Sequence, residues 1–142
     1  MEARISIITL GVRDMARAIC FYRDGLGWST TADDAAGWAI FVTAGTRLAL
    51  YPFAALAEDA ATEAGNAPPA FSGITLAHNT RTKAEVDAVL QRAVAVGGRL
   101  VKPAQQAFWG GYSGYFADPD GYLWEIAWAE SWVFNDDGSL QV

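Results

Sequence analysis

Residues 115–126 read YFADPDGYLWEI and decide the fold of the second half of the chain. Asp118-Pro119-Asp120-Gly121 is typical of a tight turn, because proline fixes φ at the second position and glycine relieves the fourth. The stretch does not fit a calcium loop, since the regular spacing of oxygen ligands and the closing acid are absent. We therefore predict that this turn joins two antiparallel strands, Tyr112 to Ala117 and Leu123 to Trp128.

The residues before this hairpin predict a strand, a helix and a further strand. Ser72 to His78 is apolar and short enough for a strand, and Lys83 to Val96 has apolar residues at helical spacing. Thr82 and Glu85 form a capping box at the start of that helix. With a strand at Arg99 to Lys102, the second half of the chain reads βαβββ.

The first half of the chain repeats this order. Its predicted helix begins after Asp14 and ends at Gly25. Its predicted strands are Ile5 to Val12, Trp28 to Thr31, Trp38 to Val42 and Arg47 to Tyr51. In addition, Ile8-Thr9-Leu10 recurs as Ile74-Thr75-Leu76. We predict an α+β fold of two tandem βαβββ modules.

These modules span residues 1–52 and 71–129. The linker, residues 53–70, is alanine-rich and acidic, so we expect it to be partly helical. The tail, residues 130–142, has apolar residues on either side of an Asp-Gly turn, which predicts a small hairpin. We expect its residues 132–134 to cover a neighbouring module or a dimer partner, because an exposed Trp-Val-Phe patch is unfavourable.

Composition narrows the classes of partner. The 142 residues carry a net charge of -6, so no basic patch is available for nucleic acid. No apolar run approaches the roughly 20 residues that span a bilayer, which argues against a membrane protein. The single cysteine, Cys20, and the lack of a signal peptide favour a cytoplasmic location. A small organic molecule is the expected ligand.

Three stretches resemble the vicinal oxygen chelate superfamily of glyoxalases, bleomycin-resistance proteins and extradiol dioxygenases. They are ITLGVRD at residues 8–14, FYRDGLGW at 21–28 and the turn stretch at 115–126. The resemblance spans nearly the whole chain. It implies that the paired modules form an eight-stranded cupped sheet with the helices outside, commonly in a homodimer.

The resemblance also implies where a metal would be bound. Family members with a metal use four positions facing into the cup, which correspond to Ile7, Leu50, Gly73 and Glu125. Only Glu125 can be a ligand, and one carboxylate is too few for tight binding of zinc or iron. We expect no metal cofactor; a divalent metal in an atypical site is the alternative. Strand alternation places His78 toward the helices and away from the cup.

Glu125 is the candidate catalytic residue. The same alternation places it on the inner face of the last strand, where desolvation would raise its pKa and suit it to act as a base. The alternative is a hydrated residue, or one paired with an arginine, that has no catalytic role.

The candidate ligand-binding residues are inner-face positions and aromatic side chains. Gly110 and Gly111 would let a flat ligand approach the backbone, although each aromatic ring also suits simple packing. The candidates are Ile7, Thr9, Trp38, Leu50, Gly73, Thr75, Trp109, Tyr112, Tyr115 and Glu125.

Three functions are consistent with these residues. The first is metal-independent binding of a small, partly aromatic organic molecule, as in the bleomycin-resistance branch. The second is a lyase, isomerase or dioxygenase that uses Glu125 as base or metal ligand. The third is a structural or partner-binding module whose fold serves only as a scaffold.

Overall fold

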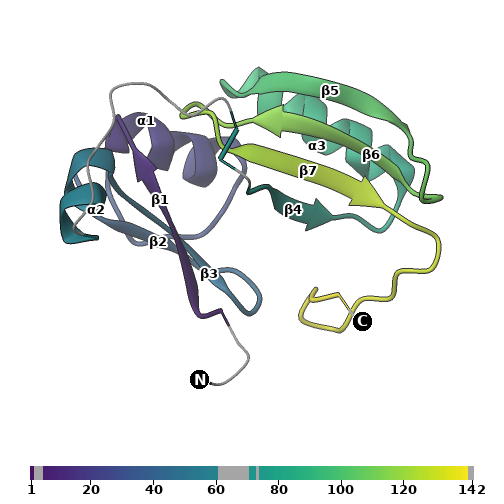
Figure 1. The fold of residues 1–142 in the computed structure, drawn as a ribbon, viewed down its shortest axis with the longest axis horizontal. Helices are drawn as coiled ribbons and strands as arrows, with labels where there is room; N and C mark the ends of the chain where they lie inside the picture. The colour runs from purple at the N-terminus through teal and green to yellow at the C-terminus, as the bar shows by residue number, and fades with distance from the viewer. Residues whose placement is uncertain (2–4, 61–70, 73, 141–142) are drawn as a thin grey trace. The chain divides into compact units, whose positions relative to one another are not determined.

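The computed structural model describes residues 1, 5–60, 71, 72 and 74–140. The chain divides into two compact units, Met1–Phe71 and Ser72–Val142, each with its own sheet and helices (Figure 1). Over the described residues the sheets have three and four strands and are not closed. The predicted α+β class is confirmed.

The first unit contains a three-stranded mixed sheet. Strand β1 (Ile7–Val12) runs parallel to β3 (Arg47–Pro52), and β2 (Ala39–Phe41) pairs with the other edge of β3 in antiparallel register. Helix α1 (Met15–Cys20) follows β1 and continues as the single π-helical turn η1 (Phe21–Gly25). The N-cap at Asp14 is confirmed, since its Oδ1 accepts a hydrogen bond from the backbone N–H of Arg17 at 3.0 Å.

The predicted strand at Trp28 to Thr31 is not formed, so this unit has three strands where the cupped sheet of eight needs four. The segment lies beside β2, where the N–H of Val42 donates to the carbonyl of Ser29 at 2.9 Å. The Thr30 hydroxyl donates to the Ile40 carbonyl at 2.8 Å. A side-chain hydroxyl therefore satisfies a carbonyl that a strand ladder would have paired with backbone.

An aromatic cluster forms the core of the first unit. Tyr22 and Phe41 are fully buried, with ring centroids 5.6 Å apart, and Trp28 lies 5.6 Å from Tyr22. The register pairs Phe41 with Leu48, which is also buried, on the same face of the sheet. The α1 and η1 segment and the sheet thus bury one face between them.

The linker is helical where the structure describes it. Helix α2 (Phe53–Asp59) follows β3 directly, whereas residues 61–70 lie outside the described part of the chain. A Cβ added to Gly11 would lie 3.1 Å from Phe53 Cδ2 and 3.2 Å from Leu56 Cδ2. Glycine at this position therefore lets α2 pack closely on β1.

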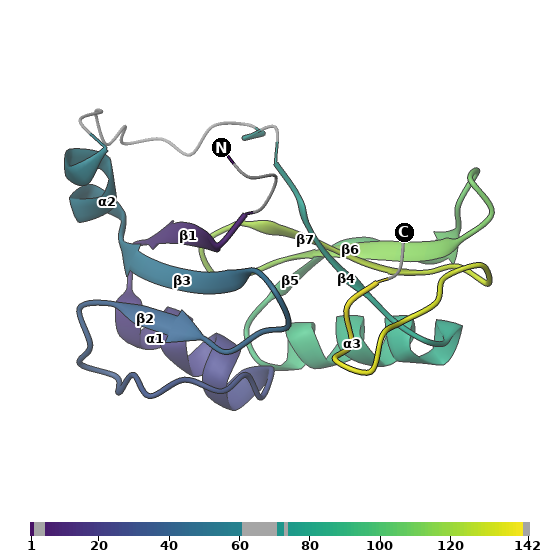
Figure 2. The same cartoon turned by 90° about the horizontal axis from the view of Figure 1, so that it is seen from below.

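The second unit has the predicted strand and helix order. Its strands β4 (Leu76–Asn79), β5 (Arg99–Gln106), β6 (Tyr112–Ala117) and β7 (Leu123–Trp128) have the spatial order β4-β7-β6-β5. Strands β4 and β7 are parallel and the other pairs are antiparallel. Helix α3 (Lys83–Ala95) lies on one side of this sheet (Figure 2). Its capping box is present, as predicted.

The turn between β6 and β7 has the structural role that its sequence indicated. The buried Asp118 carboxylate accepts hydrogen bonds from the N–H groups of Asp120 and Tyr122, at 3.0 and 2.9 Å. Gly121 takes a positive φ of 96°, which favours glycine. These contacts hold β7, and with it Glu125, in a fixed register against β6.

The tail forms the predicted small hairpin. Phe134 and Leu140 form an antiparallel bridge, and the Asn135 N–H donates to the Ser139 carbonyl at 2.8 Å. Trp132 stacks on Trp109 with a centroid distance of 5.8 Å. The Arg81 guanidinium lies 4.8 Å from the centroid of the Phe134 ring. Trp132 and Phe134, two of the three residues at 132–134, therefore pack on the second unit itself.

Across the described residues, no helix has the length and apolar character that crossing a membrane requires.

Candidate ligand-binding site

A row of polar side chains crosses the sheet of the second unit. Glu125 lies in the centre of β7, opposite Tyr115 of β6 on one side and Ala77 of β4 on the other. Tyr115 in turn pairs with Lys102 of β5. Because paired residues of neighbouring strands share a face, the three polar residues Glu125, Tyr115 and Lys102 lie side by side. We call the surface that they define the Glu125 face.

The Glu125 face is the side of the sheet opposite α3. A Cβ added to Gly114 would lie 2.7 Å from Leu90 Cδ1, so Gly114 faces α3 and its neighbour Tyr115 faces away. On β7, Trp124 and Ile126 are buried while Glu125 is half-buried. This alternation agrees with the expectation that Glu125 lies on the face of the last strand opposite Trp124 and Ile126.

The three side chains of the row interact electrostatically. Burial raises the pKa of the Tyr115 phenol, and hydrogen bonding to Glu125 and the negative charge of its carboxylate raise it further. The Lys102 ammonium lies 5.9 Å from the centroid of the Tyr115 ring. The row thus offers a ligand an anionic acceptor, a phenol and a cation along one line.

Trp109 forms a separate aromatic cluster at the β5–β6 turn. A Cβ on Gly111 would lie only 1.7 Å from Trp109 Cζ3, so the indole itself occupies the space over this glycine. Trp132 stacks on the same indole. The expectation that Gly110 and Gly111 let a ligand approach the backbone is therefore wrong for Gly111, where a side chain of the same turn fills the space.

Tyr112 does not join Tyr115 on the Glu125 face. It is three residues earlier in β6 and lies on the α3 side, where its hydroxyl donates to Asp87 Oδ1 at 3.0 Å. Naming both tyrosines as candidates for one site did not take into account that residues three apart in a strand point to opposite faces.

In the first unit, Leu50 is on the face opposite to that predicted. The parallel register pairs Thr9 with Ala49 and Leu10 with Leu50. Leu50 is fully buried on the same face as Leu10, whereas Ile7 and Thr9 are exposed on the other face. Both faces of this part of β3 are apolar, so the sequence pattern alone did not fix which one each residue occupies.

The remaining candidates lie on exposed segments or outside the described chain. Trp38 is exposed and directly precedes β2, and Thr75 is exposed and directly precedes β4. Gly73 lies outside the described residues. The structure therefore brings together Tyr115 and Glu125 of the predicted set and adds Lys102.

Sequence reasoning missed Lys102 because β5 is irregular. Its pairing with β6 shifts register between Leu100 and Lys102 and again between Lys102 and Gln105. A simple alternation counted along the strand cannot place a side chain beyond a bulge. The positive charge in an otherwise β-rich segment was the only available signal.

Of the four positions that the resemblance implies for a metal, the two in the first unit have no ligand side chain. Ile7 and Leu50 have no ligand atom, nor does Ala49, which takes the place of Leu50 on the Thr9 face. In the part of the chain that the structure describes, no group of three or more His, Cys, Asp or Glu side chains is arranged to hold a metal.

His78 lies on the α3 side of its sheet, as strand alternation predicted, because β4 pairs it with Ile126. Desolvation lowers the pKa of its imidazole below the ordinary value of 6.5, and the nearby Glu85 partly opposes this shift. A lowered pKa means that the unfolded chain binds a proton more readily than the folded one.

We therefore expect stability to depend on pH through His78. Its contribution is fully present above pH 6.5, the ordinary pKa of histidine, and is lost as the pH falls through the lower pKa of the folded state. Urea unfolding at pH 7.5 and 5.0 should show a smaller loss of stability in His78→Gln than in the wild type. An equal loss of stability between pH 7.5 and 5.0 in the two proteins would show that protonation of His78 does not cause the pH dependence.

Comparison with known proteins agrees with this fold. Residues 4–126 match the Glyoxalase/Bleomycin resistance protein/Dioxygenase superfamily, and the chain belongs to this superfamily. Among curated proteins, none matches the chain significantly.

Solved structures of similar proteins cover almost the whole chain. A glyoxalase-related enzyme from Fulvimarina pelagi is 35% identical, with a TM-score of 0.89 over 99% of this chain and 98% of its own. A glyoxalase/bleomycin resistance protein/dioxygenase from Nocardioides is 24% identical, with a TM-score of 0.75 over 92% of this chain and 87% of its own. A lactoylglutathione lyase from Agrobacterium tumefaciens is also 24% identical, with a TM-score of 0.64 over 93% of this chain and 98% of its own. At 24% identity, the similarity to the Nocardioides and Agrobacterium proteins shows only that the fold is shared.

Proposed function

We propose that this chain binds a small, partly aromatic organic molecule on the Glu125 face, without a metal, in the manner of bleomycin-resistance proteins. The observation that carries the proposal is the row of Glu125, Tyr115 and Lys102 on one face of one sheet. Binding requires only shape, stacking and a few polar groups that fix orientation, and no reactive centre.

Each member of the row has a distinct role in this proposal. The Tyr115 ring presents an aromatic surface for stacking, and its phenol lies close enough to Glu125 for the carboxylate to raise its pKa. The Glu125 carboxylate accepts hydrogen bonds from a hydroxyl or amine of the ligand, while Lys102 binds an anionic or carbonyl oxygen. A flat molecule with a donor at one end and an acceptor at the other is complementary to this row.

Isothermal titration tests the proposal with bleomycin and a panel of aromatic hydroxy acids as probes. Glu125→Gln keeps the size of the side chain but removes its charge, so we expect the best probe to bind about tenfold more weakly. Glu130→Gln, an exposed glutamate beyond β7, is the matched control and should bind like the wild type. Absence of binding to every probe, or equal affinity in Glu125→Gln, would overturn the proposal.

The interaction between Glu125 and Tyr115 also supports an enzyme of the lyase, isomerase or dioxygenase type. A carboxylate beside a phenol can accept a proton from a substrate and return it at a neighbouring position. In that case Glu125→Gln abolishes turnover while the circular dichroism spectrum is unchanged. A variant that retains its activity would remove Glu125 from this role.

A further inference from the structure

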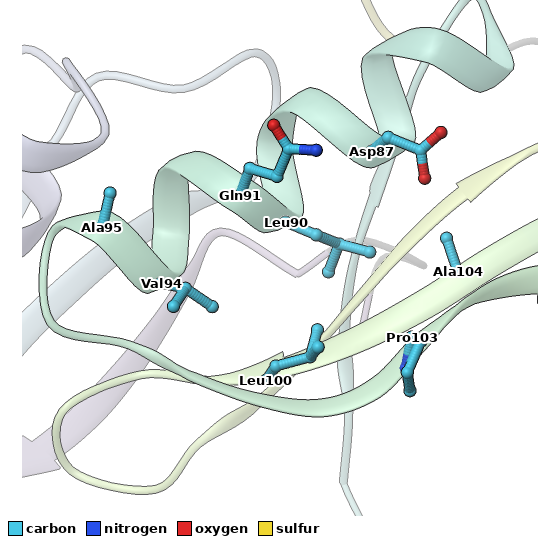
Figure 3. Close-up of a pocket in the computed structure, with 8 residues that line it drawn as sticks. All are labelled: Asp87, Leu90, Gln91, Val94, Ala95, Leu100, Pro103 and Ala104. Carbon is cyan, nitrogen blue, oxygen red and sulfur yellow. The ribbon is translucent and has the colours of Figure 1, made fainter.

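An open groove of about 490 Å³ lies between α3 and β5, on the α3 side of the second unit's sheet and thus opposite the Glu125 face. Its walls are mainly apolar, and Figure 3 shows Leu90 and Val94 of α3 pointing toward β5. Leu100 and Pro103 line it from the strand, and Asp87 and Gln91 are its polar lining residues. The volume is in the range of small-molecule sites, about 300 to 1,000 Å³.

The apolar walls of the groove are accessible to solvent. Val94 and Leu100 are each 43% exposed, although Leu90 at the base is buried. β5 is the edge strand of its sheet, but Pro103 has no N–H and the strand carries two register shifts. These features prevent regular pairing with an added strand. The groove therefore suits a small molecule held by side chains better than an extended peptide.

Asp87 places a negative charge on the same stripe of α3. It precedes Leu90 and Val94 by three and seven residues, which puts all three on one helix face. Its Oδ1 accepts the Tyr112 hydroxyl at 3.0 Å, which fixes the half-buried carboxylate. Within the described chain, this hydroxyl is the one polar partner of the Asp87 side chain.

Lys83, one turn before Asp87, does not neutralise this charge. Its ammonium lies 5.1 Å from the ring centroid of Trp128 and 5.8 Å from that of Tyr112. In the described structure it makes no ion pair with Asp87 within 4.0 Å. A carboxylate without a cationic partner, beside an apolar groove, is complementary to a ligand that supplies the cation.

We propose that this groove binds a small amphipathic amine. The protonated amine pairs with Asp87, and the hydrocarbon or aryl portion lies along Leu90, Val94 and Leu100. The net charge of -6 further favours a cationic ligand over an anionic one. This site is independent of the Glu125 face, because the two lie on opposite sides of the same sheet.

The test uses 4-phenylbutylamine as the probe, with 4-phenylbutanol and 4-phenylbutyrate as neutral and anionic analogues of similar shape. Amide shifts in two-dimensional NMR spectra of the full chain report both the affinity and the location. We expect the amine to bind about fivefold more tightly than the alcohol, and the acid to bind most weakly. The shifted signals should map to residues 87–104.

Asp87→Asn removes the negative charge but keeps the local structure, because the amide oxygen can still accept the hydrogen bond from the Tyr112 hydroxyl. We expect this variant to lose the preference for amine over alcohol, while Leu100→Ser weakens binding of both probes. Glu125→Gln should leave amine binding unchanged, which distinguishes this site from the Glu125 face. Shifts outside residues 87–104, an amine preference retained in Asp87→Asn, or dilution-dependent shifts that reveal self-association through the groove would each overturn the proposal.

Discussion

Replacement of Phe41 by alanine is expected to lower the free energy of unfolding by about 3 to 5 kcal/mol. The Phe41 side chain is fully buried, and its ring packs against Tyr22 and Trp28 with centroid distances of 5.6 and 6.2 Å. Truncation removes this apolar burial and leaves a cavity between the sheet and the η1 turn. The two remaining rings, Tyr22 and Trp28, cannot fill that space without leaving their favoured contacts.

Urea unfolding followed by tryptophan fluorescence measures this loss, and Phe108→Ala provides the control. Phe108 is also a phenylalanine, but it is fully exposed in the turn between β5 and β6. Its truncation should change the stability by less than about 0.5 kcal/mol. Similar losses in both variants would show that the aromatic cluster does not stabilise the first unit as described.

Replacement of Gly114 by alanine is expected to destabilise the protein by about 3 kcal/mol and to weaken the candidate site. An added Cβ would lie 2.8 Å from the backbone nitrogen of Ala104 and 2.9 Å from the carbonyl oxygen of Lys102. Backbone atoms cannot move aside like the end of a flexible side chain, so β5 and β6 must separate. This separation would also move Lys102 away from Tyr115.

Gly37→Ala is the matched control, because nothing lies within 4 Å of a Cβ at that position and its φ is not positive. Thermal unfolding should show a clear fall in melting temperature for Gly114→Ala and little change for Gly37→Ala. An unchanged Gly114→Ala protein would mean that the close approach of β5 and β6 is not required for stability.

The elements with strong local signals were predicted correctly. The capping box of Thr82 and Glu85 located α3, and the Asp118 to Gly121 turn located β6 and β7 with their observed bounds. These signals depend on hydrogen bonds within a few residues of the chain, so they can be recognised in the sequence itself.

The predictions that failed depended on pairing between distant residues. Trp28 to Thr31 has β-forming residues, but the Thr30 hydroxyl donates a hydrogen bond to the Ile40 carbonyl and no strand forms. Leu50 was placed on the wrong face because its face follows from the register of β3 against β1. Tertiary contacts decide both the missing strand and the face of Leu50. Neither contact can be recognised from the neighbouring residues in the sequence.

The sequence alone determined the fold class, the order of the elements in the second unit and the placement of Glu125 on the face of the last strand opposite Trp124 and Ile126. Only the tertiary structure showed that Lys102 joins Tyr115 and Glu125 in one row, and that Tyr112 lies on the other side beside Asp87. The physical reason is that a motif is encoded within one segment, whereas a site is made by the register between strands. Two bulges in β5 are enough to change which side chains meet.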